Sequence, residues 1–162
     1  MPLIRNGETV EDTWTFFGVE DEISYTEGGT SLTLARFLNE ADAAITVNTP
    51  IGVRLSPEDD PAELAPYLDK LTLIEVDFPK YTDGRGYSQA QLLRRRYGYD
   101  GELRAVGHVL TDQILYMHRS GFDAYETARA DLSSVVKALE EYSEYYQPAA
   151  DGSVSVFRKR HA

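Results

Sequence analysis

From residue 43 onward, short apolar blocks alternate with longer stretches of helical spacing. The short blocks are rich in β-branched and aromatic residues, which is typical of strands. Apolar residues that recur three and four positions apart indicate helices. We therefore expect strands over residues 44–47, 51–55, 73–78, 102–106 and 122–125, and helices over residues 31–41, 87–97, 111–120 and 131–146. A further helix through residues 64–71 should be short or kinked, because Pro66 lies inside it.

The alternation of strands and helices predicts an α/β fold. Four consecutive strand–helix units imply a parallel sheet with right-handed crossovers. Two architectures remain open at this point, an open sheet and half of a (β/α) barrel. We expect an α/β domain over residues 43–147. An irregular extension, residues 1–42, should precede it and pack on the core, with a short strand near residues 14–17. A tail, residues 148–162, should follow, and residues 154–157 could add an edge strand there.

Length and composition narrow the class of protein. The 162 residues suit one domain with one core. No apolar run approaches the roughly 20 residues that span a bilayer, and the N-terminus lacks the apolar core of a secretory signal. We therefore expect a cytoplasmic protein without a membrane partner. The chain has no cysteine, which excludes disulfides, thiol nucleophiles and cysteine-ligated iron–sulfur clusters. Electrons in a redox reaction would need a partner or a bound cofactor, whose identity the sequence leaves unknown.

Charge is distributed unevenly along the chain. The net charge of −11 disfavours nucleic-acid binding. Residues 79–119, however, carry seven cations and four acids. A cationic segment in an acidic protein favours a small anionic ligand or an acidic partner surface. Three of these cations, at positions 94–96, are expected to lie on a solvated helix face.

Two loops are the predicted location of a site. In parallel α/β proteins, ligands bind at the carboxyl ends of the strands, which selects residues 77–88 and 107–113. Both loops should lie at one edge of the sheet. Glycines allow a ligand to approach the backbone closely, and an arginine can hold a phosphate-, sulfate- or carboxylate-like group. The candidate anion-binding residues are Asp83, Gly84, Arg85, Gly86, Ser88, Arg104 and Gln113.

The same residues also fit an interpretation without a ligand. The first loop could be a tight turn in which Asp83 bonds to the backbone and Arg85 pairs with Asp77 or Asp83. Arg104, in the middle of a strand, needs a partner if it is buried. Glu102 is too near in sequence to be a good partner, so Asp77 or Glu75 on the neighbouring strand is expected. Arg104 is then a structural ion pair or an anion ligand.

His108 and Asp112 are the candidate catalytic residues. They lie four positions apart, after a predicted strand and at the start of a helix, and such a pair could transfer protons. Alternatively, Asp112 caps the helix and His108 is half-exposed. His118 and His161 join no cluster with ligand spacing, so we expect no protein-built metal site.

Several segments resemble a bacterial domain-of-unknown-function family, number nine-three-four. They are residues 77–88, 92–94, 101–107, 112–113 and 119–123, within a stretch of roughly 52–126. Genes of that family tend to lie beside assimilatory sulfite reductase, and its members are often labelled as probable oxidoreductases of sulfite reduction. The family offers no established catalytic residues to carry over. This chain has His108 where an Asp is usual, Thr111 where a basic residue is common, and Ser120 where Cys is frequent.

Two hypotheses of function follow. The resemblance implies an accessory protein or probable oxidoreductase component of assimilatory sulfite or sulfate reduction. Its partner would be sulfite reductase or another sulfur-assimilation protein, and its loops would bind an anion. The alternative is an enzyme acting on a small anionic substrate, with His108 and Asp112 as acid–base groups and Arg85 holding the anion.

Overall fold

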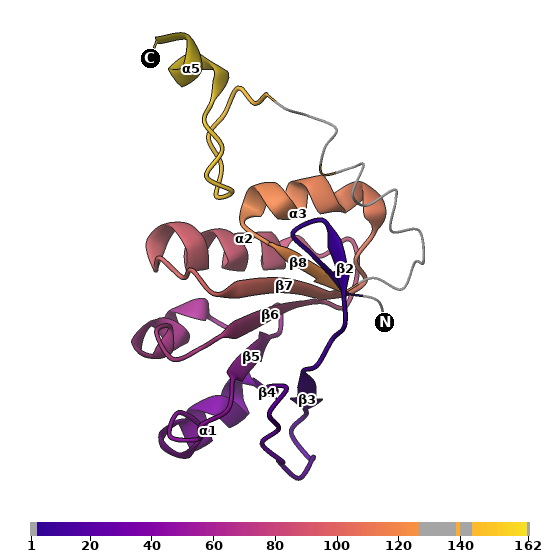
Figure 1. Cartoon of the computed structure of the whole chain (residues 1–162), viewed down its shortest axis with the longest axis vertical. Helices are drawn as coiled ribbons and strands as arrows, with labels where there is room; N and C mark the ends of the chain where they lie inside the picture. Colours follow the sequence, from indigo (N-terminus) through magenta and orange to yellow (C-terminus); the bar gives the residue numbers. More distant parts are fainter. Residues whose placement is uncertain (1–2, 127–138, 140–143, 162) are drawn as a thin grey trace.

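The computed structural model describes residues 3–126, 139 and 144–161. It has an α/β fold built on one open, curled, eight-stranded sheet (Figure 1). The strands are β1 (Leu3–Arg5), β2 (Glu8–Val10), β3 (Thr15–Phe17), β4 (Thr30–Thr33), β5 (Ile51–Leu55), β6 (Leu73–Phe78), β7 (Glu102–Gly107) and β8 (Ala124–Glu126). The helices are α1 (Leu34–Ala44), the 3₁₀ helix η1 (Pro61–Tyr67), α2 (Arg85–Gln91), the π-helix η2 (Leu92–Arg96), the 3₁₀ helix η3 (Thr111–Gln113), α3 (Ile114–Ser120) and α5 (Val156–His161).

The sheet is mixed, which corrects the expectation of a purely parallel one. Its order is β2-β1-β8-β7-β6-β5-β4-β3. Neighbours from β3 to β8 are parallel, as the strand–helix succession predicts. By contrast, β1 lies antiparallel to β8, and β2 lies antiparallel to β1. The two added strands form a hairpin around Asn6 (φ 51°) and Gly7 (φ 81°), and an Asn-Gly pair provides the left-handed backbone of such a two-residue turn.

The N-terminal residues expected to be irregular thus contribute four strands, β1 to β4. The predicted short strand near residues 14–17 is confirmed as β3. The predicted strand at residues 44–47 is wrong, because α1 extends through Ala44. The buried residues Leu34, Phe37, Ala41 and Ala44 keep the helical period to that point. Thr33 caps the helix, and its hydroxyl accepts a hydrogen bond from Arg36 N.

Other predicted elements differ mainly in type. The helix around Pro66 is a short 3₁₀ helix, as the proline requires. The helix predicted over residues 87–97 is α2 followed by η2, and that over 111–120 is η3 followed by α3. The edge strand considered for residues 154–157 is wrong, since this region enters α5. The helix predicted over residues 131–146 falls mostly outside the described residues.

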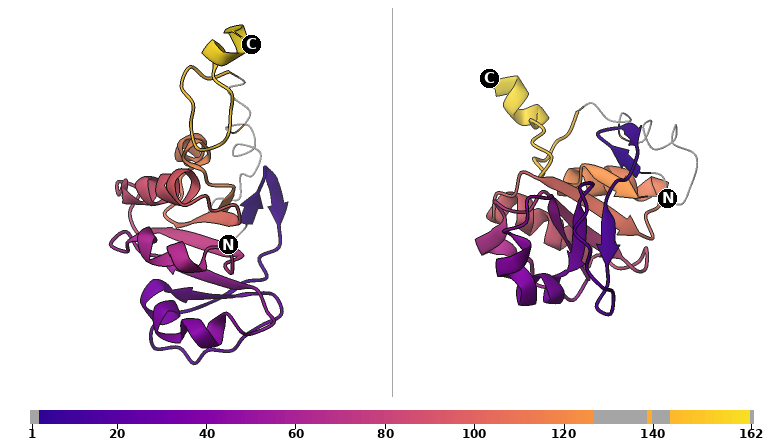
Figure 2. Two further views of the ribbon diagram at one scale, coloured as in Figure 1. Left: turned by 90° about the vertical axis from the view of Figure 1, so that its left-hand side faces the viewer. Right: turned by 60° about the horizontal axis from the view of Figure 1, so that its bottom comes forward.

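The two faces of the sheet differ in chemistry. Helices cover one face, and the N-terminal segment runs along the other (Figure 2). On the helix-covered face, Phe78 packs against the rings of Tyr87 and Phe122. Gly86 brings α2 close to the sheet, because a Cβ there would lie 2.6 Å from the Phe78 ring. On the opposite face, β6 and β7 place Glu75 and Arg104, both buried.

Candidate functional site

The two predicted loops do lie side by side at the carboxyl edge of the sheet. Gln113 Nε2 donates to the Tyr81 carbonyl at 2.9 Å. His108 Nδ1 lies 2.8 Å from the Pro79 carbonyl oxygen, and the His108 backbone N–H donates to the Phe78 carbonyl. The loops therefore support each other through side-chain contacts with backbone carbonyls.

Within the first loop, Arg85 is occupied by carboxylates. Its Nη2 lies 2.7 Å from Asp83 Oδ2, and its Nη1 lies 3.8 Å from Glu58 Oε1. The hydrogen bonds from Arg85 lower the pKa of Asp83 to about 2. This is the pairing of the tight-turn interpretation. Because Asp83 largely compensates the charge of Arg85 within the loop, the loop attracts an anion only weakly.

The other residues of the predicted anion site do not gather around Arg85. Gly84 has an ordinary right-handed backbone with φ −85°, and Gly86 is buried against the sheet. Ser88 lies on α2, facing a different hollow. Gln113 bonds to the other loop, as described above. Arg104 lies within the sheet, on the face without helices.

His108 and Asp112 form no hydrogen bond or ion pair with each other in the described part of the chain. Asp112 does not cap its helix, because the capping position is Leu110 and has no side-chain bond. A different carboxylate, Asp77, lies close enough to His108 to interact with it electrostatically. Burial raises the pKa of Asp77, and Arg54 opposes this rise.

Arg104 is part of a charge row, which we define as Arg5, Asp12, Arg54, Glu75, Glu102 and Arg104. The row crosses the helix-free face of the sheet. Arg104 Nη2 lies 2.7 Å from Glu102 Oε1, so the expectation that Glu102 would be a poor partner is wrong. Two residues apart on a strand, the side chains share a face, and the long arginine reaches back to the carboxylate. Asp12 adds a contact at 3.0 Å and Glu75 a longer one at 3.9 Å.

The charge row continues beyond Arg104 on both sides. Arg5 lies 3.2 Å from Glu102. Glu75 receives two hydrogen bonds from Arg54 and one from Ser31. Burial opposes the charge on Arg104, but its carboxylate partners raise its pKa overall. The row is satisfied internally and is a structural feature of the sheet.

The three consecutive arginines 94–96 have different environments. The expectation of a solvated face is wrong for Arg94, because its side chain is only 14% exposed. It donates to the carbonyls of Gly121, Tyr99 and Gly101, and pairs with Asp123 at 2.9 Å. Four residues after the buried Ala90, it lies at the margin of the helix's buried stripe.

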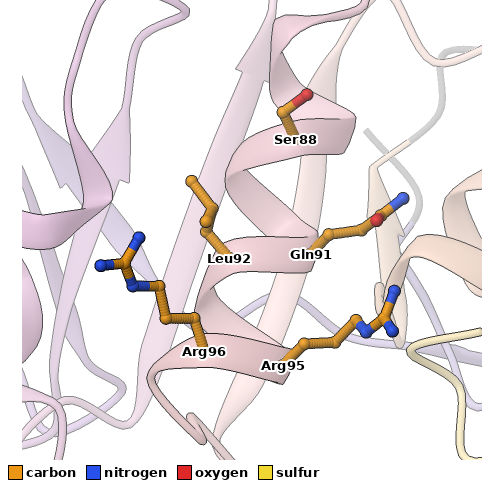
Figure 3. A pocket seen from close by; sticks show the side chains of 5 residues that line it. All are labelled: Ser88, Gln91, Leu92, Arg95 and Arg96. Carbon is orange, nitrogen blue, oxygen red and sulfur yellow. The ribbon is translucent and has the colours of Figure 1, made fainter.

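Arg95 faces a groove, which we call the Arg95 groove. Its volume is about 410 Å³, and its lining includes Gln91, Tyr116, Arg119, Ser120 and residues 147–150. A second hollow, of about 670 Å³, adjoins it and shares Gln91 and Arg95. Figure 3 shows Gln91 and Arg95 extending to one side of the helix, and Leu92 and Arg96 to the other. Within the described residues, neither Arg95 nor Arg96 is within ion-pair distance of a carboxylate.

The second arginine of the groove, Arg119, is fully engaged. It lies 3.0 Å from Asp151 Oδ2, donates to the Gln147 carbonyl, and stacks 3.8 Å from the Tyr145 ring centre. Burial alone would raise the pKa of Asp151, but hydrogen bonds from Ser153 and Arg119 lower it. Arg119 therefore holds the C-terminal wall of the groove, while Arg95 lines the groove without a carboxylate partner among the described residues.

Sequence reasoning missed Arg95, although a signal was present. Opposite charges three or four residues apart pair on a helix surface. The positions three and four away from Arg95 are Gln91, Leu92, Gly98 and Tyr99, none of them acidic. A helical arginine without an acidic neighbour is available for another partner.

The described residues contain no cluster of His, Asp and Glu suited to a metal ion. No helix among them has the length and apolar character of a membrane span.

Comparison with curated proteins gives no match. A family model of bacterial proteins of unknown function does match, over residues 52–157. The matched stretch contains every residue of the Arg95 groove and leaves β1 to β4 and α1 outside. With most of its length matched, the chain belongs to this bacterial family, DUF934.

Proposed function

We propose that the protein binds a small oxyanion in the Arg95 groove and acts as an accessory component of assimilatory sulfite reduction. One observation carries the anion-binding part. Arg95 faces a groove and has no carboxylate partner among the described residues, whereas Arg85, Arg94, Arg104 and Arg119 all do.

The groove offers chemistry that matches an oxyanion. A guanidinium donates two parallel N–H bonds to a pair of oxygens. Gln91 and Ser120 add an amide and a hydroxyl to the same lining. The net charge of −11 repels anions in general. An anion would therefore bind this protein where a local positive charge overcomes that repulsion.

Sulfite is the proposed anion because of the family resemblance, and it presents three oxygens to such donors. An accessory role fits a chain without cysteine better than a thiol-based reductase would. Sulfite reductase is the proposed partner for the same reason of resemblance.

Two experiments test the proposal. Titration with sulfite, and separately with phosphate, should shift the Arg95 Nε–Hε signal in ¹H–¹⁵N spectra. Spectra unchanged by both anions would remove the binding proposal. Deletion of the gene should impair growth on sulfate, and the protein should co-purify with sulfite reductase. Normal growth together with no co-purification would remove the pathway assignment.

A second candidate function is acid–base catalysis by His108. The supporting observation is that Nδ1 is held by the Pro79 carbonyl while the side chain is exposed, which leaves Nε2 without a hydrogen-bond partner among the described residues. Asp112, the expected acid–base partner, forms no hydrogen bond with His108 among the described residues, and Asp77 interacts with His108 only through a weak electrostatic effect. A His108→Ala variant that fully complements a deletion strain would remove this candidate.

A further inference from the structure

Two distant segments hold most of the exposed apolar side chains. Among the described residues, seven large hydrophobic side chains are exposed, and five of them lie on these segments. Phe16 and Val19 belong to the N-terminal segment, residues 8–27. Tyr146, Val154 and Phe157 belong to the C-terminal arm, residues 144–161. Phe157 is 67% exposed and Val19 is 71% exposed, so most of their apolar surface is free to contact a partner.

The two segments carry opposite charge. Residues 8–27 contain seven acids and no Lys or Arg. The helix α5, at the end of the arm, contains Arg158, Lys159 and Arg160 and no acid. Lys159 is paired with Glu144 within the arm. Among the described residues, Arg158 and Arg160 have no carboxylate within ion-pair distance, and Glu20 and Glu22 have no cation within that distance.

The helix α5 and the loop that follows β3 lie at opposite ends of one molecule (Figure 1). The arm is tied to α3 through Arg119, and through a hydrogen bond from Ala150 N to the Arg119 carbonyl. Beyond this attachment, α5 stands clear of the sheet, at one end of the molecule (Figure 1). The loop between β3 and β4, which holds Glu20 and Glu22, lies at the opposite end.

We infer that a second copy of this chain brings the segments together, with α5 of one copy docked on residues 16–22 of the next. Phe157 would pack on Phe16 and Val19, while Arg158 and Arg160 would face Glu20 and Glu22. Both the apolar residues and the charges are complementary between the two ends. Because the contact joins different surfaces, it is head-to-tail, and it extends into an open chain unless the rotation between copies closes it into a ring.

Each copy is acidic, so distant charges oppose this association. At about 0.1 M salt the screening length is about 10 Å, which weakens repulsion between the bodies more than attraction at the contact. The association is therefore expected to be modest and to grow with concentration.

Sedimentation velocity of the full chain at about 0.1 M salt tests the inference. The wild-type protein should sediment faster as concentration rises. Reversal of the arm charges (Arg158→Glu with Arg160→Glu), or of the acidic loop (Glu20→Arg with Glu22→Arg), should raise the dissociation constant about tenfold or more. A chain with all four substitutions should associate again, because the complementary pairs are restored. Circular dichroism checks that each variant is folded.

A matched control reverses two exposed acids elsewhere, Glu63→Arg with Asp100→Arg, and should leave the association intact. Three results would overturn the inference. They are a wild-type protein that stays monomeric at all concentrations, an association that both charge reversals leave unchanged, and a four-substitution chain that fails to recover.

Discussion

The loop around Arg85 and the Arg95 groove both present an arginine on the same helical segment, and they differ in what that arginine contacts. Arg85 lies 2.7 Å from Asp83 and also approaches Glu58. Arg95 faces a groove with no carboxylate partner among the described residues. The loop has the glycines and the position at a strand end that are typical of a site. The groove has the uncompensated charge.

The difference shows that position at a strand end and nearby glycines do not make an arginine available to an anion, because a neighbouring carboxylate can already pair with it. Arg94 and Arg104 are paired in the same way in the interior, where their guanidinium nitrogens contact carbonyls and carboxylates. Removing a paired arginine should affect stability, and removing Arg95 should affect binding.

Replacement of Arg104 should have the largest effect. An Arg104→Ala variant removes the buried cation that joins Glu102, Asp12 and Glu75 and should lose about 3–5 kcal/mol of unfolding free energy. Urea unfolding measures this loss. A loss comparable to that of an exposed residue would show that the charge row contributes nothing to the fold.

Neighbouring positions on one helix give a matched pair. Arg94→Ala removes four hydrogen bonds to charged or carbonyl acceptors and should cost about 2–3 kcal/mol. Arg95→Ala, one residue away, should leave the unfolding free energy nearly unchanged. Equal losses in the two variants would contradict the assignment of different roles.

Replacement of Asp77 should have a smaller effect on the unfolding free energy, and this effect depends on pH. Burial raises its pKa in the folded state, so the folded protein binds this proton more tightly than the unfolded chain. The resulting stability is present below the ordinary pKa and is lost as pH rises through the folded value. Asp77→Asn should therefore be more stable than wild type at about pH 7, and the difference should shrink towards about pH 4. Urea unfolding at both pH values checks this, and a variant less stable at neutral pH would contradict it.

The smallest effect is expected for Arg85→Ala, which should change the pKa of Asp83 without changing the fold. Hydrogen bonds from Arg85 hold the pKa at about 2, below the ordinary 3.8. In Arg85→Ala the pKa should return towards its ordinary value, as measured by carboxyl ¹³C shifts during a pH titration. A pKa that stays low without Arg85 would show that the pairing does not compensate the arginine.

Much of the central sheet could be predicted from the sequence. Strands β5, β6 and β7 follow apolar blocks that end in turn residues, and their parallel pairing follows from the helices between them. The hairpin of β1 and β2 was missed because the strands are short, although Asn6-Gly7 signals the turn. The error at residues 44–47 has a physical cause as well. Ala44 completes the buried stripe of α1, and apolar residues at a helix end look like the start of a strand.

The candidate site was harder to predict because pairing between side chains depends on tertiary contacts. Asp12 reaches Arg104 from 92 residues away, and Asp123 reaches Arg94 from 29 residues away. The spacing of residues along the chain therefore predicts neither of these two pairs. The partner of Arg85, in contrast, is two residues away, and the sequence offered that pairing as one of its two interpretations.

Anion affinity in two matched variants tests the central claim most directly. Calorimetric titration with sulfite should give binding for the wild type, unchanged affinity for Arg85→Ala, and a loss of about tenfold or more for Arg95→Ala. Both substitutions remove one positive charge from a helical segment, so the net charge of the two variants is the same. The opposite result, with affinity lost in Arg85→Ala and retained in Arg95→Ala, would place the site at the loop and contradict the account.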